Sequence, residues 1–191
     1  MLLTFHYQFS LKKIILASGS PRRRAMLTAA GLEFDVIPSS AEELHDAAIP
    51  LHLLCEENAR LKAIAVIKDY PKAKVIGADT LVYIDQTPLG KPRNEEEARK
   101  TLAKLSGRLH QVCTGVCIAQ GEKTETFHAI TEVVFKNLTR DIITDYMSKV
   151  NVMDKAGSYA VQEHGDIIIE EVRGDYDNVV GLPVVQLLAK L

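Results

Sequence analysis

An α/β fold is predicted by three features of this 191-residue sequence. Short apolar, β-rich runs alternate along the chain with segments whose apolar residues recur at helical spacing. Gly, Ser, Pro or Asn separates these segments, as expected where strands end and helices begin. Hydrophobic residues make up 47% of the chain, which is enough for the core of one globular domain. We therefore expect a single domain over residues 1–191.

The first strand and helix are predicted by the stretch ILASGSPRRRAML, which begins at residue 14. Ser20 is expected to cap the helix, and Pro21 occupies the first helical position, where its missing N–H costs nothing. The arginines at 22–24 add positive charge to the first turn, where a cation is unfavourable unless an anion lies nearby. With Ser18 and the free backbone N–H groups, this arrangement predicts a phosphate site. A solvated basic helix start is the alternative.

The remaining elements follow from periodicity and from turn residues. Strands are expected at 34–37, at 74–84 with an interruption at 77–79, at 112–119, at 124–135 and at 167–172. Helices are expected at 51–65, after Asn94 until Gly107, at 139–150 and at 184–191.

Three charged residues attract attention because of their positions. Asp79 is flanked by strand-forming apolar residues, and burying an unpaired carboxylate costs several kcal/mol, so Asp79 should face a cation, a metal or a cleft. An aspartate that hydrogen-bonds a turn is the alternative. Lys91 precedes a proline on a loop where neither propensity nor packing calls for a lysine. Lys62 lies on an amphipathic helix, where a lysine usually faces solvent.

The bulk properties limit the function classes. The chain has 23 Lys and Arg against 25 Asp and Glu, and its net charge of −2 gives no general attraction to nucleic acids or anionic membranes. Three cysteines without paired spacing favour a reducing compartment and small core residues over disulfides. The N-terminus lacks the order of a secretory signal, and no run reaches membrane-spanning length. We expect a cytoplasmic protein, and residues 1–11 are expected to be either a frayed extension or the result of a mis-called start.

Four ordered motifs between residues 14 and 191 resemble the Maf family of septum formation proteins, which are nucleoside triphosphate pyrophosphatases. The motifs are ASGSPRR, GADT, GKP followed by LSG-x-x-H-x-V-x-TG, and the segment from DKAG to NVVGLP, and NARLKA resembles a further family segment. The resemblance implies a mixed twisted sheet flanked by helices, of the Maf/ITPase-like type. It also implies two lobes with the nucleotide in a central cleft.

The resemblance also assigns the site residues. It implies that Asp79 and Glu43 are catalytic and hold a divalent metal, Mg²⁺ or Mn²⁺, with Glu42 a close second to Glu43 by alignment. Which acid is the base and which is the metal ligand stays open. His110 matches the pattern too but is expected to serve the fold. The residues implied to bind substrate are Ser18, Arg22, Arg23, Lys62, Lys91, Thr80 and Gln162.

The implied activity is hydrolysis of dTTP and UTP to the monophosphate and pyrophosphate. Arg22, Thr80 and Gln162 stand where the dTTP/UTP branch of the family has these residue types, whereas Ala160 and Glu163 replace glycines common in the family. A 7-methyl-GTP pyrophosphatase of the same family and a non-enzymatic nucleotide-binding regulator of cell division are the alternatives. A nucleic-acid-binding module is disfavoured by the charge. A homodimer is compatible with the sequence but not required by it.

Overall fold

The computed structural model describes residues 13–46 and 48–191, so the predicted N-terminal extension lies outside the described residues. Its strands are β1 (Ile14–Leu16), β2 (Asp35–Val36), β3 (Lys74–Ile84), β4 (Thr87–Leu89), β5 (Leu109–Gln120), β6 (Lys123–Phe135) and β7 (Ile169–Arg173). Its helices are α1 (Pro21–Ala29), α2 (Leu51–Ile67), α3 (Glu95–Leu105), α4 (Arg140–Lys149), the 3₁₀ turn η1 (Ala156–Ser158), α5 (Gly165–Ile168), α6 (Tyr176–Val180) and α7 (Val184–Leu188).

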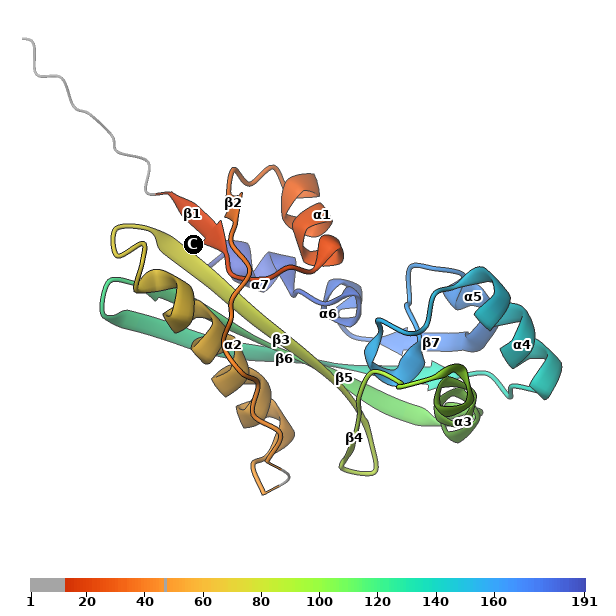
Figure 1. Ribbon diagram of the computed structural model, residues 1–191. Helices are drawn as coiled ribbons and strands as arrows, with labels where there is room; N and C mark the ends of the chain where they lie inside the picture. The colour runs from red at the N-terminus through yellow and green to blue at the C-terminus, as the bar shows by residue number, and fades with distance from the viewer. Residues whose placement is uncertain (1–12, 47) are drawn as a thin grey trace, which may run out of the picture.

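One mixed sheet runs through the molecule in the order β2-β1-β3-β5-β6-β7, and β4 pairs with β3 at the side. β1 lies parallel to both β2 and β3, whereas the remaining pairs are antiparallel. The long strands β3, β5 and β6 cross the whole molecule (Figure 1). The sheet therefore connects both ends of the protein.

The helices gather in two groups, which form two lobes on the shared sheet. α1, α2, α6 and α7 surround one half of the long strands, and α3, α4 and α5 surround the other half (Figure 1). The second lobe has its own buried cluster, in which Leu102 of α3 and Tyr146 of α4 pack against Phe135 of β6. The expected two-lobed α/β architecture is confirmed.

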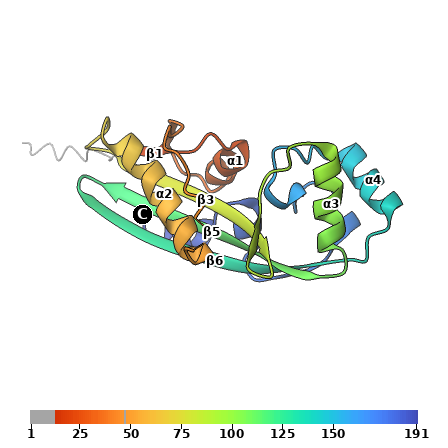
Figure 2. The same cartoon turned by 60° about the horizontal axis from the view of Figure 1, so that its bottom comes forward.

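In the first lobe, the two sheet faces carry different helices because neighbouring strand residues point to opposite sides. Ile15 and Val75 pack against α2, whereas Leu16 and Ile76 pack in the cluster that contains α1 and α7. Figure 2 shows α2 lying across the long strands.

α2 lies unusually close to the sheet because two glycines leave room for its backbone. A Cβ atom on Gly77 of β3 would lie 2.1 Å from the carbonyl oxygen of Ala59, and one on Gly115 of β5 would lie 2.3 Å from the carbonyl carbon of Cys55. Real Cβ atoms do not approach so closely, so these positions require glycine. The glycines bring the polar side chains of α2 within reach of β3.

Several predicted boundaries were wrong. β3 continues through 77–79 without interruption, because the sequence break at Gly77 serves helix packing and not a turn. The last strand was expected at 167–172, but 165–168 form α5 and β7 begins at Ile169. The closing helix ends at Leu188 and not at 191. The short elements β4 and α6 had no periodicity long enough to predict.

In the described part of the chain, no helix combines the length and the apolar character needed to cross a bilayer.

Candidate functional site

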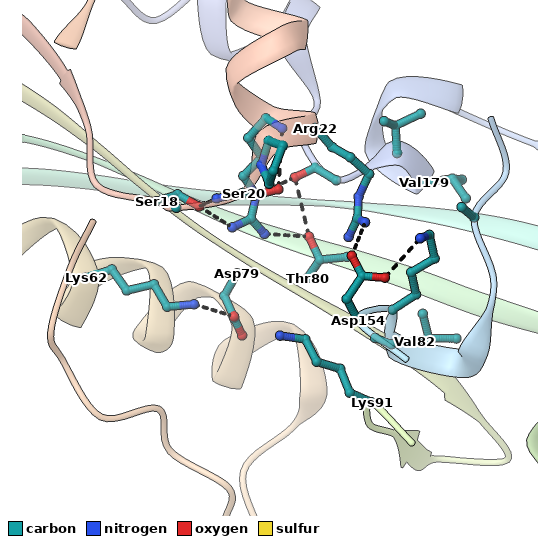
Figure 3. A pocket seen from close by; sticks show the side chains of 18 of the residues that line it. Ser18, Ser20, Arg22, Lys62, Asp79, Thr80, Val82, Lys91, Asp154 and Val179 are labelled. Carbon is teal, nitrogen blue, oxygen red and sulfur yellow. Dashed lines mark hydrogen bonds and ion pairs between the residues drawn. The ribbon is translucent and has the colours of Figure 1, made fainter. Parts of the chain in front are cut away.

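A cavity of about 480 Å³ opens at the N-terminus of α1, beside the middle of β3 and between the lobes (Figure 3). Its walls come from the β1–α1 loop, Ser39 and Glu43 of the segment before α2, α2 itself, β3, the loop after β4, the segment between Asp154 and Gln162, and residues 179–181. Every residue that the sequence analysis assigned to substrate, metal or catalysis lines this cavity: Ser18, Arg22, Arg23, Glu43, Lys62, Asp79, Thr80, Lys91 and Gln162. Glu42, the alternative to Glu43, does not line it.

The N-terminus of α1 forms as expected. Ser20 caps the helix by accepting a hydrogen bond from the backbone N–H of Arg23, and Pro21 is the first helical residue. Arg22 reaches across the cavity, where its Nη1 lies 3.8 Å from Oδ2 of Asp154 on the other lobe (Figure 3). Arg24 is exposed and does not line the cavity. The three arginines at this helix start thus lie in three different environments.

Arg23 is the buried member of the three arginines. Its Nε donates to the carbonyl oxygen of Gly181 at 2.9 Å, and its Nη1 donates to Ser18 Oγ at 3.0 Å and to the carbonyl oxygen of Ala78 at 2.9 Å. Nη2 donates to Oγ1 of Thr80 at 2.9 Å. A guanidinium has five N–H donors, so one remains for a ligand. Burial lowers the pKa of Arg23, and the charge of Asp79 opposes that shift.

Asp79 is the acid at the centre of the site and is only 5% exposed. Its Oδ1 lies 2.7 Å from Nζ of Lys62, which also lies 2.6 Å from Oε1 of Glu43. Figure 3 shows Lys62 extending from α2 to this carboxylate on β3. The expectation that Asp79 faces a cation and a cleft is confirmed, and the alternative of a turn aspartate is excluded because Asp79 lies inside β3.

Lys91 and Thr80 complete the polar wall. Lys91 is exposed on the loop after β4, and Figure 3 shows its side chain directed into the cavity near Asp79. It forms no ion pair with any residue in 13–46 or 48–191. Thr80 Oγ1 lies 2.9 Å from Oγ1 of Thr114, in addition to its bond from Arg23. Lys91 is therefore available to an anionic ligand, while Thr80 is largely engaged within the protein.

The other end of the cavity carries Gln162 on an exposed turn. Its Nε2 donates to Oε1 of Glu163 at 3.4 Å, and Oε2 of Glu163 lies 3.4 Å from Nζ of Lys155. Glu163 thus turns one N–H of the Gln162 amide toward itself. The apolar side chains of Val82 on β3 and Val179 on α6 also line the cavity (Figure 3).

Sequence reasoning gave no role to Lys155, although its motif was recognised. Its ammonium is buried and contacts the carbonyl oxygen of Asn151 at 2.6 Å and Oδ1 of Asp154 at 3.0 Å, as well as Glu163. Burial works to raise the pKa of Asp154, but Lys155 and Arg22 hold that pKa below its ordinary value. A lysine directly before the small residues Ala156, Gly157 and Ser158 was the available signal.

His110 and the cysteines lie away from the cavity. His110 is buried, and its Nε2 pairs with the hydroxyl of Tyr159 at 2.8 Å. Burial lowers the pKa of His110 to about 4 and raises the pKa of Cys117 to about 12. The three cysteines are free and buried, as expected of core residues. His110 serves the fold, which confirms that expectation.

Two carboxylates in the cavity fit the ligand preferences of a divalent metal ion. Among the described residues, no three His, Cys, Asp or Glu side chains converge tightly enough to hold a metal by themselves. Asp79 and Glu43 nevertheless place two carboxylates around one point, where the ammonium of Lys62 lies. Mg²⁺ commonly takes one or two protein carboxylates, with substrate phosphates and waters as its other ligands. This donor set matches that preference.

Comparisons with known proteins agree with the geometry. A family model described as Maf-like protein matches residues 13–191. The dTTP/UTP pyrophosphatase of Akkermansia muciniphila is 54% identical over 171 residues, 90% of each chain. The protein of the same name from Bacillus mycoides is 44% identical over 181 residues, 95% of each chain. The Ham1 protein of Staphylococcus aureus, at 20% identity and a TM-score of 0.50, covers 66% of this chain and 73% of its own, and shows the fold alone.

Proposed function

The chain belongs to the Maf family, and from this premise we propose that it hydrolyses dTTP and UTP to the nucleoside monophosphate and pyrophosphate. Relatives at 44–54% identity over nearly their whole length are named dTTP/UTP pyrophosphatases. One observation carries the proposal for this chain: two carboxylates and several cations from both lobes converge on one cavity. Such a set suits a strongly anionic substrate and the activation of a water molecule.

The cations have different parts in this proposal. The N-terminus of α1, with Ser18, would receive phosphate oxygens on its free N–H groups. Lys91 has no carboxylate partner within the described residues, and Arg22 has only a distant one, so both can pair with phosphate at little cost. Lys62 is bound to two acids, so it would reach the phosphates by exchanging a carboxylate contact for a phosphate contact.

In the proposed reaction, a water oxygen attacks the α-phosphorus in line with the leaving group. The bond between the α-phosphorus and the bridging oxygen breaks, and pyrophosphate leaves with the bonding electron pair, its charge stabilised by Arg22, Lys91 and Lys62. Asp79 or Glu43 takes the proton of the attacking water. Held by these two carboxylates, Mg²⁺ or Mn²⁺ would supply charge neutralisation and water activation.

The uracil or thymine base would lie at the Gln162 end of the cavity. An amide can both donate and accept, as the edge of a pyrimidine requires. Glu163 takes one N–H of the Gln162 amide, which leaves the second N–H to donate to a carbonyl oxygen of the base and the amide oxygen to accept from its imide N–H. The imide N–H and the ring carbonyl oxygens of uracil and thymine match this donor and acceptor pair, which supports dTTP and UTP as substrates.

The experiment is a competition among dTTP, UTP, CTP, GTP and 7-methyl-GTP, with kcat/KM measured from pyrophosphate release. We expect dTTP and UTP to exceed the others by more than tenfold, because an unpaired amide costs about 1–3 kcal/mol. Activity should disappear in excess chelator and return with Mg²⁺ or Mn²⁺. A clear preference for 7-methyl-GTP would show that the chain is a 7-methyl-GTP pyrophosphatase of the same family. Binding without turnover would favour the non-enzymatic regulator, and release of orthophosphate would refute the reaction class.

A further inference from the structure

We propose that Asn58 of α2 is a positioning residue that holds Asp79 and the segment carrying Glu43 in one fixed arrangement. The inference rests on the proposed function, in which these two acids stand at the reacting end of the cavity. Asn58 does not line the cavity and has no charge, so it would act only through the two acids.

The amide of Asn58 makes three hydrogen bonds while only 2% of the residue is exposed. Its Oδ1 accepts from the backbone N–H of Leu44 at 2.7 Å, and its Nδ2 donates to the carbonyl oxygen of Leu44 at 3.2 Å. The same Nδ2 donates its second hydrogen to Oδ2 of Asp79 at 3.2 Å. One buried side chain thus links the residue next to Glu43 to the central acid.

The segment from residue 38 to residue 46 depends on this link, because it contains no helix or strand. Within the described part of the chain, its hydrogen bonds and ion pairs to other elements are the two bonds between Leu44 and Asn58 and the ion pair between Glu43 and Lys62. The other hydrogen bonds of the segment are local ones. Without Asn58, Glu43 would be held mainly by its own ion pair.

Two residues one turn apart on α2 contact the carboxylate of Asp79. Lys62 donates a hydrogen bond to Oδ1 and Asn58 donates one to Oδ2, so both carboxylate oxygens have partners on the same helix. Residues four apart lie on one helix face, and the absence of a side chain at Gly77 lets that face approach β3. Because Asn58 is neutral, it orients Asp79 and leaves the negative charge of this carboxylate available to a substrate-bound cation.

A purely structural anchor would require only the two bonds to Leu44. The third bond, to Asp79, predicts an effect on turnover that loop anchoring does not. We expect Asn58→Ala to lower kcat about 30-fold while KM changes less than about threefold, because small displacements of catalytic groups are costly to rate and Asn58 touches no phosphate-binding residue. Asn58→Ser, which keeps a short donor and acceptor, should lose less. Glu57→Gln on the same helix, where Glu57 pairs with Arg60, is the matched control and should keep kcat.

The decisive measurement is a double-mutant cycle for kcat. If Asn58 acts mainly through Asp79, the acid that it contacts directly, then Asn58→Ala should cost less than about threefold in an Asp79→Asn background, because that acid is already lost. A full 30-fold cost in that background would overturn the proposal. So would a folded Asn58→Ala protein whose kcat stays within about threefold of the wild-type value.

A second measurement needs no variant and stays informative if Asn58→Ala fails to fold. Amide hydrogen exchange of the unmodified protein should show Leu44 protected while Glu42, two residues earlier, exchanges freely, because the Leu44 N–H is bonded to a buried amide. Equal exchange at the two positions would refute the anchor. If the unmodified protein releases no pyrophosphate, the proposed function fails, whereas loss of protection or of the kinetic coupling in an active protein refutes only the role of Asn58.

Discussion

Replacing Arg23 with methionine should destabilise the protein, although the resemblance assigns this residue to the substrate. Methionine keeps the approximate length of the side chain but cannot donate a hydrogen bond. The change would remove four hydrogen bonds, which now join the β1–α1 loop, β3 and the segment before α7. Arg23 is therefore expected to hold three segments of the site together.

The magnitude follows from the groups left behind. The carbonyl oxygens of Ala78 and Gly181 lose a charged donor, at about 1–3 kcal/mol each, and keep only longer contacts of 3.4 Å, from Lys62 Nζ and Thr80 Oγ1 respectively. Thr80 keeps its partner Thr114, and Ser18 borders the cavity, where water can replace the donor. Burial of the guanidinium lowers the pKa of Arg23, which shows that its charged form pays a desolvation cost that methionine avoids. We therefore expect the free energy of unfolding to fall by about 3 kcal/mol.

The assay is urea unfolding at neutral pH, with Arg22→Met as the matched control. Arg22 pairs only with Asp154, at 3.8 Å and with both side chains partly exposed, so its loss should change the free energy of unfolding by less than about 0.5 kcal/mol. Its loss should instead raise KM. Arg23→Lys should still destabilise, because an ammonium cannot reproduce the planar fork of donors. If Arg23→Met unfolds at the wild-type urea concentration while KM rises, the internal role of Arg23 is refuted.

Three further outcomes are expected from the site and the fold. Asp79→Asn should lower kcat about 100-fold or more while the protein stays folded, and normal turnover in this variant together with its loss in Glu43→Gln would assign the essential acid to Glu43. Burial holds the pKa of His110 at about 4, below its ordinary 6.5, so the unfolded chain binds the proton first as pH falls. The free energy of unfolding should therefore decline by up to about 3 kcal/mol between pH 6.5 and pH 4. A His110→Gln variant whose free energy of unfolding declines equally in urea titrations would disprove this cause. Gly115→Ala should lose about 2–4 kcal/mol in the same assay because its Cβ would overlap the backbone of α2, whereas Gly90→Ala, which meets nothing within 4 Å, should be neutral.

Local structure could be read from the sequence because residues a few positions apart decide it. Ser20 and Asn94 cap their helices as predicted, since a cap depends only on a side chain and the backbone N–H groups two or three residues later. The helix predicted at 51–65 exists as Leu51–Ile67, because its apolar spacing already defined a buried face. The motif matches carried the candidate site residues further, to one cavity.

Only the tertiary structure decided which of those residues face the cavity and which are held inside the protein. Arg22 and Arg23 are neighbours of the same type, yet one reaches into the cavity and the other is buried, because the rotation of α1 against the sheet sets their exposure and no local pattern encodes that rotation. Asp79 acquires Lys62 and Asn58 as partners because Gly77 lets α2 approach β3. Periodicity shows which face of an element is buried but not what it is buried against, so the sequence alone determined the elements and the chemistry available, and long-range packing determined which groups meet.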